Sequence, residues 1–219
     1  MIVGLIGFAI PAFLFTKAQT TIDSSLAGML NSLTPLFTLF VGILFYRSRA
    51  GWMSIAGLIM GLIGAVGLMW NGDMNVFRGI NVFALFIVAA TICYGINVNE
   101  IKFKLAHLSS LEITSLAFLF TGPPAGIYLL FTDFTTVSET PDYLLNLVYI
   151  ALLALFSSVI AVLIFNHLIK YTTTLFATSV TYVIPLFAIM WGIIDGESIR
   201  LIQLIWITVI LLGVYLVNK

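Results

Sequence analysis

The sequence predicts an all-α integral membrane protein built as a polytopic bundle of eight transmembrane helices. Three observations predict this class: the composition, the regular alternation of apolar runs with short polar turns, and a repeated proline-containing helix. Of 219 residues, 61% are hydrophobic and 8% are charged, whereas soluble domains carry about 25% charged residues. With a mean hydropathy of +1.16, the chain has too much apolar surface for a water-soluble fold of this size.

Each helix is predicted from an apolar run that approaches or reaches the roughly 20 residues needed to cross a bilayer. In chain order the predicted helices are Met1–Thr16, Ser24–Tyr46, Gly51–Trp70, Ile80–Lys102, Leu111–Phe131, Tyr143–Ile169, Thr174–Ile194 and Leu201–Val217. The turns between them carry helix-breaking or charged residues, among them Arg47-Ser48-Arg49, Asn71-Gly72-Asp73, Glu139-Thr140-Pro141-Asp142 and Asp195-Gly196-Glu197-Ser198. No turn is long enough to separate soluble domains.

A proline-containing stretch indicates an internal repeat. Thr34-Pro35-Leu36-Phe37 returns 150 residues later as Ile184-Pro185-Leu186-Phe187. At the same offset Ser24 corresponds to Thr174, Gly28 to Thr178, Asn31 to Thr181 and Gly42 to Gly192. Helical periodicity places the small and polar members of each copy on one face. A shared face in a shared register favours two copies of one unit.

The distribution of basic residues predicts the orientation in the membrane. With eight crossings both termini lie on one side, which we expect to be the cytoplasm. That side then holds Arg47, Arg49, Lys102, Lys104, Lys170 and Lys219, against Lys17, Arg78 and Arg200 outside. In this topology the Pro35 helix and the Pro185 helix run in opposite directions. Such an inverted repeat is a frequent plan of secondary transporters.

Charge and cysteine content exclude several classes of protein. The formal net charge is zero, so no nucleic-acid partner is expected. The single cysteine, Cys93, excludes an intrachain disulfide and argues against a cysteine metal cluster. A metal site formed by His107 and His167 is the minority alternative, because no third ligand is evident, and no metal or cofactor is expected. Expected partners are the lipid bilayer and a small-molecule solute. Gly57, Gly61 and Gly64 indicate close helix packing, with homodimer contact as the alternative.

The ordered motifs resemble the EamA-like family of the drug/metabolite transporter superfamily. They are the two Pro-Leu-Phe helices with Gly42 and Gly192, Gly196-Glu197, the glycine-rich Gly57–Gly67, Ala90–Asn97 and Leu212-Gly213-Val214-Tyr215-Leu216. The resemblance implies ten helices in two inverted five-helix repeats that move small metabolites, often outward. Residues 1–72 then form an incomplete first repeat of three helices, and residues 79–219 a second repeat of five. The family's first two helices are absent, and Arg47 replaces a frequent acidic residue.

Two groups of polar residues are candidates for lining a substrate cavity. The first is the repeated stripe, comprising Asn31, Pro35, Thr178, Thr181 and Pro185, with Tyr182 beside it. Close helix packing is the alternative, and the prolines favour a kink over direct contact. The second group, Thr91, Tyr94 and Asn97, repeats every third residue along one helix face. A membrane-embedded asparagine needs either a wet cavity or a hydrogen-bonding partner on another helix.

The predicted function is secondary transport of small organic metabolites by alternating access, as an exporter or a facilitator. No Asp or Glu lies at the centre of a predicted span, which favours a facilitator over a proton-driven carrier. A truncated, non-transporting remnant or a partner subunit is the alternative. An intramembrane enzyme has less support, because the hydrolase and metalloprotease motifs are missing; a phosphate-binding loop is missing as well.

Overall fold

The computed structural model describes residues 1–69, 81–132 and 142–217 of the chain. Within these residues the helices follow one another as eight rods, each overlapping one predicted segment and beginning and ending within three residues of its predicted ends. The all-helical prediction is therefore confirmed. Several predicted features lie outside the described residues, namely the turns Asn71-Gly72-Asp73 and Glu139-Thr140-Pro141, the boundary between the two predicted repeats, Arg78 and Lys219.

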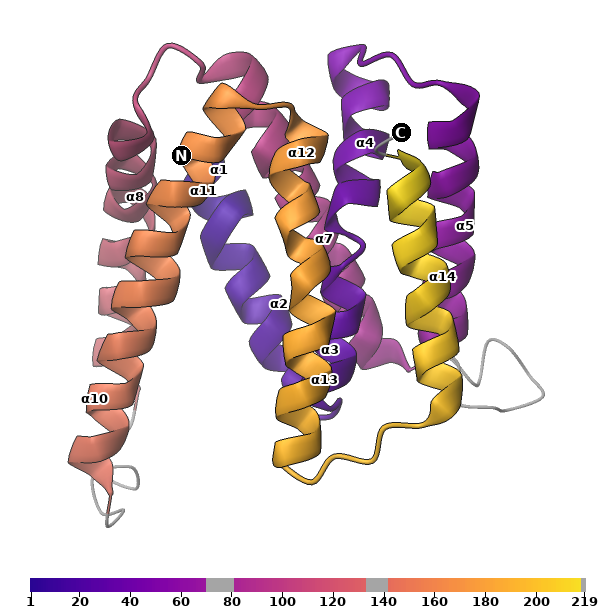
Figure 1. Cartoon of the computed structure of the whole chain (residues 1–219). Coiled ribbons are helices and arrows are strands. Elements are labelled where there is room, and N and C mark those ends of the chain that lie inside the picture. The colour runs from indigo at the N-terminus through magenta and orange to yellow at the C-terminus, as the bar shows by residue number, and fades with distance from the viewer. Residues whose placement is uncertain (70–80, 133–141, 218–219) are drawn as a thin grey trace.

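Figure 1 shows the rods side by side, several of them divided into shorter helices. In chain order the elements are α1 (Ile2–Gly4), η1 (Leu5–Ala9), α2 (Ile10–Gln19), α3 (Ser24–Asn31), α4 (Thr34–Tyr46), α5 (Trp52–Met69), α7 (Val82–Lys104), α8 (Ser110–Leu130), α10 (Tyr143–Leu153), η2 (Ala154–Ile160), α11 (Ala161–Tyr171), α12 (Thr174–Ser179), η3 (Val180–Val183), α13 (Ile184–Ile194) and α14 (Leu201–Val217). Here η1 and η2 are π-helical turns and η3 is a 3-10 turn.

Five rods in the described part of the chain are long and apolar enough to cross a membrane. They are Ile2–Gln19, Ser24–Tyr46, Val82–Lys104, Ser110–Leu130 and Tyr143–Tyr171. Three further apolar helices are shorter, Trp52–Leu68, Ile184–Ile194 and Leu201–Val217. Eight complete crossings remain a prediction.

Helix α7 is central to the bundle, because α2 and α4 both pack along it. Asn99 of α7 is fully buried and donates its side-chain amide to the Thr38 carbonyl of α4 at 2.9 Å. Tyr46 of α4 donates to Glu100 of α7 at 2.5 Å. These polar contacts supplement an apolar core that includes Leu30, Leu33, Leu36, Ala84 and Ile87.

The glycine-rich helix α5 packs closely against α14 of the same chain. A Cβ on Gly213 would lie 2.7 Å from the Gly57 carbonyl and 2.7 Å from the Gly61 amide nitrogen. A Cβ on Gly64 would lie 2.8 Å from Ile210. Small residues allow two backbones to approach this closely. These three predicted packing glycines therefore serve contacts inside one chain.

Both predicted proline kinks are present as breaks in a rod. Proline lacks the N–H that would bond to the carbonyl four residues earlier, so the α-helical ladder is interrupted there. Before Pro35, the Ser32 and Leu33 amides turn back to the carbonyls of Met29 and Leu30, in a 3-10 pattern. Before Pro185 the break is the 3-10 turn η3.

The two broken rods cross each other in opposite directions. Helix α3 packs against α13, and α12 packs against α4. Contact is close at Gly28, where an added Cβ would collide with Ala188. The first half of each rod therefore faces the second half of the other, as Figure 1 shows for α3 with α13.

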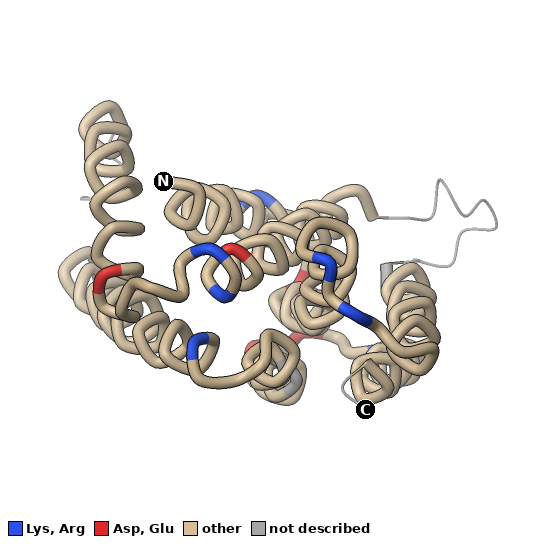
Figure 2. The backbone as a smooth tube through the Cα atoms, turned by 90° about the horizontal axis from the view of Figure 1, so that it is seen from above, with Lys and Arg blue, Asp and Glu red and all other residues tan. Residues whose placement is uncertain are grey.

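The outer faces of the bundle are apolar and the ends carry the charges. No residue of α10 or η2 is buried by the described part of the chain, and Leu153 and Phe156 are examples of exposed apolar side chains there. Figure 2 looks onto the end where α4 meets α5 and α7 leads into α8, and shows Lys and Arg gathered at these turns. An apolar belt between charged ends is the surface that a lipid bilayer requires.

Candidate functional site

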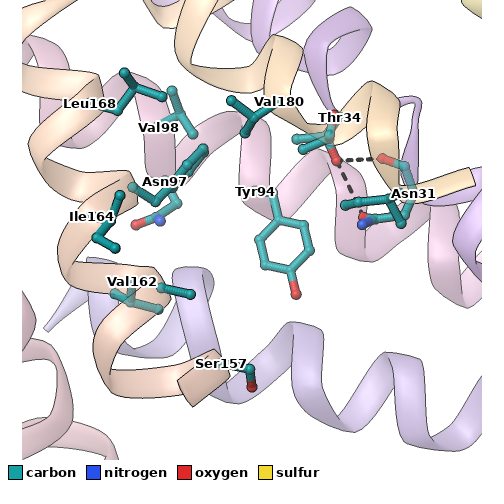
Figure 3. A pocket seen from close by; sticks show the side chains of 14 residues that line it. Asn31, Thr34, Tyr94, Asn97, Val98, Ser157, Val162, Ile164, Leu168 and Val180 are labelled. Atoms are coloured by element: carbon teal, nitrogen blue, oxygen red, sulfur yellow. Dashed lines mark hydrogen bonds between the residues drawn. The ribbon is translucent and has the colours of Figure 1, made fainter. Parts of the chain in front are cut away.

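A cavity of about 590 Å³ lies where the two proline breaks meet α7 and α11 (Figure 3). Its walls come from five parts of the chain: the α3–α4 break, α7, η2 with α11, η3 and the start of α13. The lining residues are Asn31, Thr34, Tyr94, Asn97, Val98, Ser157, Ala161, Val162, Ile164, Phe165, Leu168, Val180, Thr181 and Ile184. None of these described residues is charged, and the lining combines polar side chains with apolar ones.

The proline break shapes one wall of the cavity. Because Pro35 cannot bond to the carbonyl of Asn31, that carbonyl needs another donor. The Thr34 hydroxyl provides it at 2.8 Å and also lies 3.4 Å from the Asn31 side-chain oxygen. Figure 3 shows both interactions at the cavity edge. In the second copy Ile184 stands in place of Thr34 and has no hydroxyl to offer.

Tyr94 and Asn97 of α7 form the opposite wall, and Figure 3 places Tyr94 between Asn97 and the Asn31–Thr34 pair. Asn97 is 6% exposed, and its Oδ1 has no hydrogen-bond partner among the described residues. Its amide packs against Gly7 of η1, where an added Cβ would lie 2.6 Å from Oδ1. Leaving a buried carbonyl oxygen unpaired costs about 1–3 kcal/mol of stability. The unpaired Asn97 oxygen is therefore an unusual feature of this site.

A second cavity, of about 360 Å³, lies on the other side of Tyr94 and Asn97. Residues of η1, α2, α8 and η2 join the wall here, together with Asn166 of α11. Asn166 is buried and donates to the Thr114 hydroxyl at 2.9 Å. The two cavities share Tyr94, Asn97, Ser157, Val162 and Phe165.

The structure brings together four of the nine predicted site residues in the lining of the larger cavity, namely Asn31, Tyr94, Asn97 and Thr181. Of Tyr182 only the backbone, in η3, is described. Four others are not among the described residues lining either cavity. Thr91 and Thr178 are fully buried, and their hydroxyls bond to carbonyls of their own helices. Pro35 and Pro185 are buried where α4 and α13 begin.

Several lining residues were not among the predicted site residues. Thr34 could have been found, because it precedes the proline of a repeated stretch that was already a candidate. Ser157 lies in the π-helical turn η2, and π-helical turns are frequent at functional sites. Val98, Ile164 and Leu168 carry no signal, because they are apolar residues in apolar helices.

One carboxylate closes the bundle at the end opposite the basic turns. Glu197, which follows α13, accepts hydrogen bonds from the Ser24 amide at 2.9 Å, the Ser24 hydroxyl at 2.7 Å and the Ser25 amide at 3.1 Å. Asp23 precedes α3 but makes no side-chain capping bond, so Glu197 caps this helix from across the bundle. Partial burial raises the pKa of the Glu197 carboxyl, but hydrogen bonds from Ser25 and Ser24 outweigh it and lower the pKa overall.

The apolar helices and the cavity between the two broken rods define a helical integral membrane protein. The chain belongs to the EamA-like transporter family, which it matches over residues 1–70 and 82–219. This match confirms the family that the sequence motifs resemble.

Proteins similar to the chain include two curated relatives and a solved structure. The first relative, described as an uncharacterized transporter in the trpA 3' region of Buchnera aphidicola subsp. Schlechtendalia chinensis, is 22% identical over 93% of this chain and 67% of its own length. An uncharacterized transporter of Haemophilus influenzae is 26% identical over 69% of this chain and 50% of its own length. A crystal structure with 18% identity covers 98% of this chain and 72% of its own, with a TM-score of 0.62, and so supports the fold alone.

Proposed function

We propose that the chain is a secondary transporter of small, uncharged organic solutes, working by alternating access as a facilitator or an exporter. The observation that carries this proposal is the cavity between the two broken rods, which has hydrogen-bonding groups and no charged lining residue among those described. Binding sites of transporters lie where two repeats meet and where interrupted helices turn backbone groups towards the ligand.

The arrangement of the rods supports an inverted repeat. The two broken rods cross in opposite directions, as the charge distribution predicts. The π-helical turn Leu5–Ala9 recurs within Ala154–Ile160, 150 residues on, which is the offset of the two prolines. A local irregularity at the same register of two segments is expected if both derive from one unit.

The two ends of the bundle differ in a way that suits alternating access. At one end Glu197 ties α13 to α3, and Gly192 packs near Ser25. The cavity lies on the other side of the proline breaks, along α11 towards Leu168. We infer a state closed at the Glu197 end and hollow towards the basic end, which the charge rule assigns to the cytoplasm together with both termini.

The test is a flux measurement with the purified chain in liposomes loaded with a mixture of uncharged and charged metabolites. We expect faster efflux of one or more uncharged solutes than from protein-free liposomes. The cavity variants Tyr94→Ala and Thr181→Val should slow it, whereas Asn146→Leu, an exposed amide on α10, should not. Efflux equal to that of protein-free liposomes for every solute would contradict the proposal.

A partner subunit or a non-transporting remnant is the competing function. The observation that favours it is that the chain is shorter than its relatives, since it spans between 50% and 72% of the lengths of the three similar proteins named above. The test compares the chain with a version to which two apolar helices of a relative are added at the N-terminus. If only the extended version transports a solute, this alternative replaces the first.

A further inference from the structure

We infer that the two cavities form one two-compartment binding site, in which Asn97 selects uncharged amphipathic solutes that carry an N–H or O–H donor at one end. This inference deepens the proposed function and rests on it. The larger compartment takes the apolar body of the solute, and Asn97, in the shared wall, accepts the hydrogen bond from its polar end.

The first step is that Asn97 presents a buried acceptor without a partner, whereas the hydroxyl protons of the neighbouring threonines are already used in hydrogen bonds. In the larger cavity the hydroxyls of Thr34 and Thr181 are already bonded to the carbonyls of Asn31 and Thr178. Asn97 Oδ1 has no such partner in the described part of the chain, although the residue is only 6% exposed. A buried acceptor of this kind is stabilised when a ligand donor reaches it.

The second step is the position of Asn97 between the compartments. It belongs to the walls of both cavities, as do Tyr94 and Ser157. Gly7 leaves space for the amide, since an added Cβ would lie 2.6 Å from Oδ1 and 2.7 Å from Nδ2. Gly7 therefore leaves room for the Asn97 amide in the wall that the two compartments share.

The third step is the chemical character of the walls. Val98, Ile164 and Leu168 give the larger compartment an apolar side. Ser158 and Asn166 give the smaller compartment further hydrogen-bonding groups. No described residue of either wall is charged, so an ion would enter without a counter-charge. The ligand class is therefore neutral, apolar along its body and a hydrogen-bond donor at one end.

The experiment measures equilibrium binding to the purified full chain in nanodiscs. The probes are radiolabelled N-acetyl-leucinamide, N-acetyl-phenylalaninamide and N-acetyl-glycinamide, each compared with its N,N-dimethylamide, which lacks the terminal donor. We expect the Leu and Phe amides to bind more tightly than the Gly amide. We also expect each primary amide to bind about tenfold more tightly than its dimethyl analogue, the effect of one hydrogen bond.

Three variants test the role of Asn97. Asn97→Leu should abolish the preference for the primary amide while retaining the preference for a large apolar body. Gly7→Ala should weaken the same preference by displacing the amide. Asn146→Leu makes the same exchange at an exposed position of α10 and should change neither, and thermal unfolding confirms that each variant is folded.

Two results would overturn the inference: no primary amide binds the wild-type chain, or its preference over the dimethylamide survives in Asn97→Leu. Because binding is measured without transport, the outcome is separable from that of the flux assay. A chain that binds the amides through Asn97 but moves no solute would refute the transporter proposal alone.

Discussion

Glu197 is expected to hold the closed end of the bundle together, and removing its carboxylate tests this directly. The carboxylate accepts three hydrogen bonds from the first turn of α3, two on Oε1 and one on Oε2. In Glu197→Gln one oxygen remains to accept from Ser24. The new amide N–H₂ faces the Ser25 N–H, and because both groups are donors, that hydrogen bond is lost. In Glu197→Ala all three bonds are lost.

The magnitude follows from the kind of interaction that is removed. Loss of an N-terminal cap costs about 0.5–2 kcal/mol, and a hydrogen bond to a charged group contributes about 1.5–3 kcal/mol. Because Glu197 is partly exposed, we expect the local opening of α3 to become easier by about 1.5–3 kcal/mol in Glu197→Ala. That corresponds to roughly ten- to hundredfold faster amide exchange if exchange is limited by local opening.

The assay is hydrogen–deuterium exchange of the peptide that covers Ser24–Asn31, read by mass spectrometry in nanodiscs. Glu197→Gln should fall between the wild type and Glu197→Ala. Asp195→Asn removes an exposed acid from the same turn and should leave the α3 peptide unchanged. Wild-type exchange in both Glu197 variants would refute the capping role, as would an equal increase in Asp195→Asn.

The pH dependence of this contact has a definite sign. Hydrogen bonding lowers the pKa of Glu197 in the folded state, so the carboxylate stabilises the fold above its unfolded pKa, about 4.3. That contribution is lost as the pH falls through the lowered folded pKa. The difference in thermal stability between wild type and Glu197→Gln should therefore be constant from pH 7 to about pH 5 and shrink only below about pH 4.3. A difference that disappears near pH 6 would contradict this reasoning.

Two further predictions concern the proline break and the glycine-packed helices. Thr34→Val leaves the Asn31 carbonyl without its hydroxyl donor and should destabilise the chain by about 1–3 kcal/mol in thermal unfolding. Thr38→Val is the control, because its hydroxyl only adds a bond to a carbonyl inside a regular helix, and it should cost less. Gly57→Ala should lower the unfolding temperature because the new Cβ collides with α14, whereas Gly122→Ala, with nothing within 4 Å, should not; equal effects would contradict the close packing.

Much of the fold could be predicted from the sequence because the features that define a membrane helix are local in the sequence. A run of apolar residues must satisfy its backbone hydrogen bonds internally, so length and composition alone place each rod. The breaks before Pro35 and Pro185 are equally local, since a missing N–H interrupts any helix. The repeated register of small residues likewise follows from the order of residues, and α3 and α13 do meet through Gly28.

The candidate site depends on contacts that lie beyond this local information. Helical spacing places Thr91, Tyr94 and Asn97 near one another on α7, but it does not say which neighbouring helix covers each of them. In the structure Thr91 is covered and bonds within its own helix, whereas Tyr94 and Asn97 face the cavities. The role of Glu197 could not be foreseen either, because its partners lie 172 and 173 residues away.

The sequence by itself determined that this protein is a helical membrane bundle, where its rods begin and end to within three residues, and that two of them break at a proline. Only the tertiary structure decided which polar side chains meet around one cavity and which are buried in contacts between helices. The physical reason is that periodicity defines the angle of a residue about its own helix axis. Burial and hydrogen bonding depend on what lies on that side, and only the packed bundle decides that.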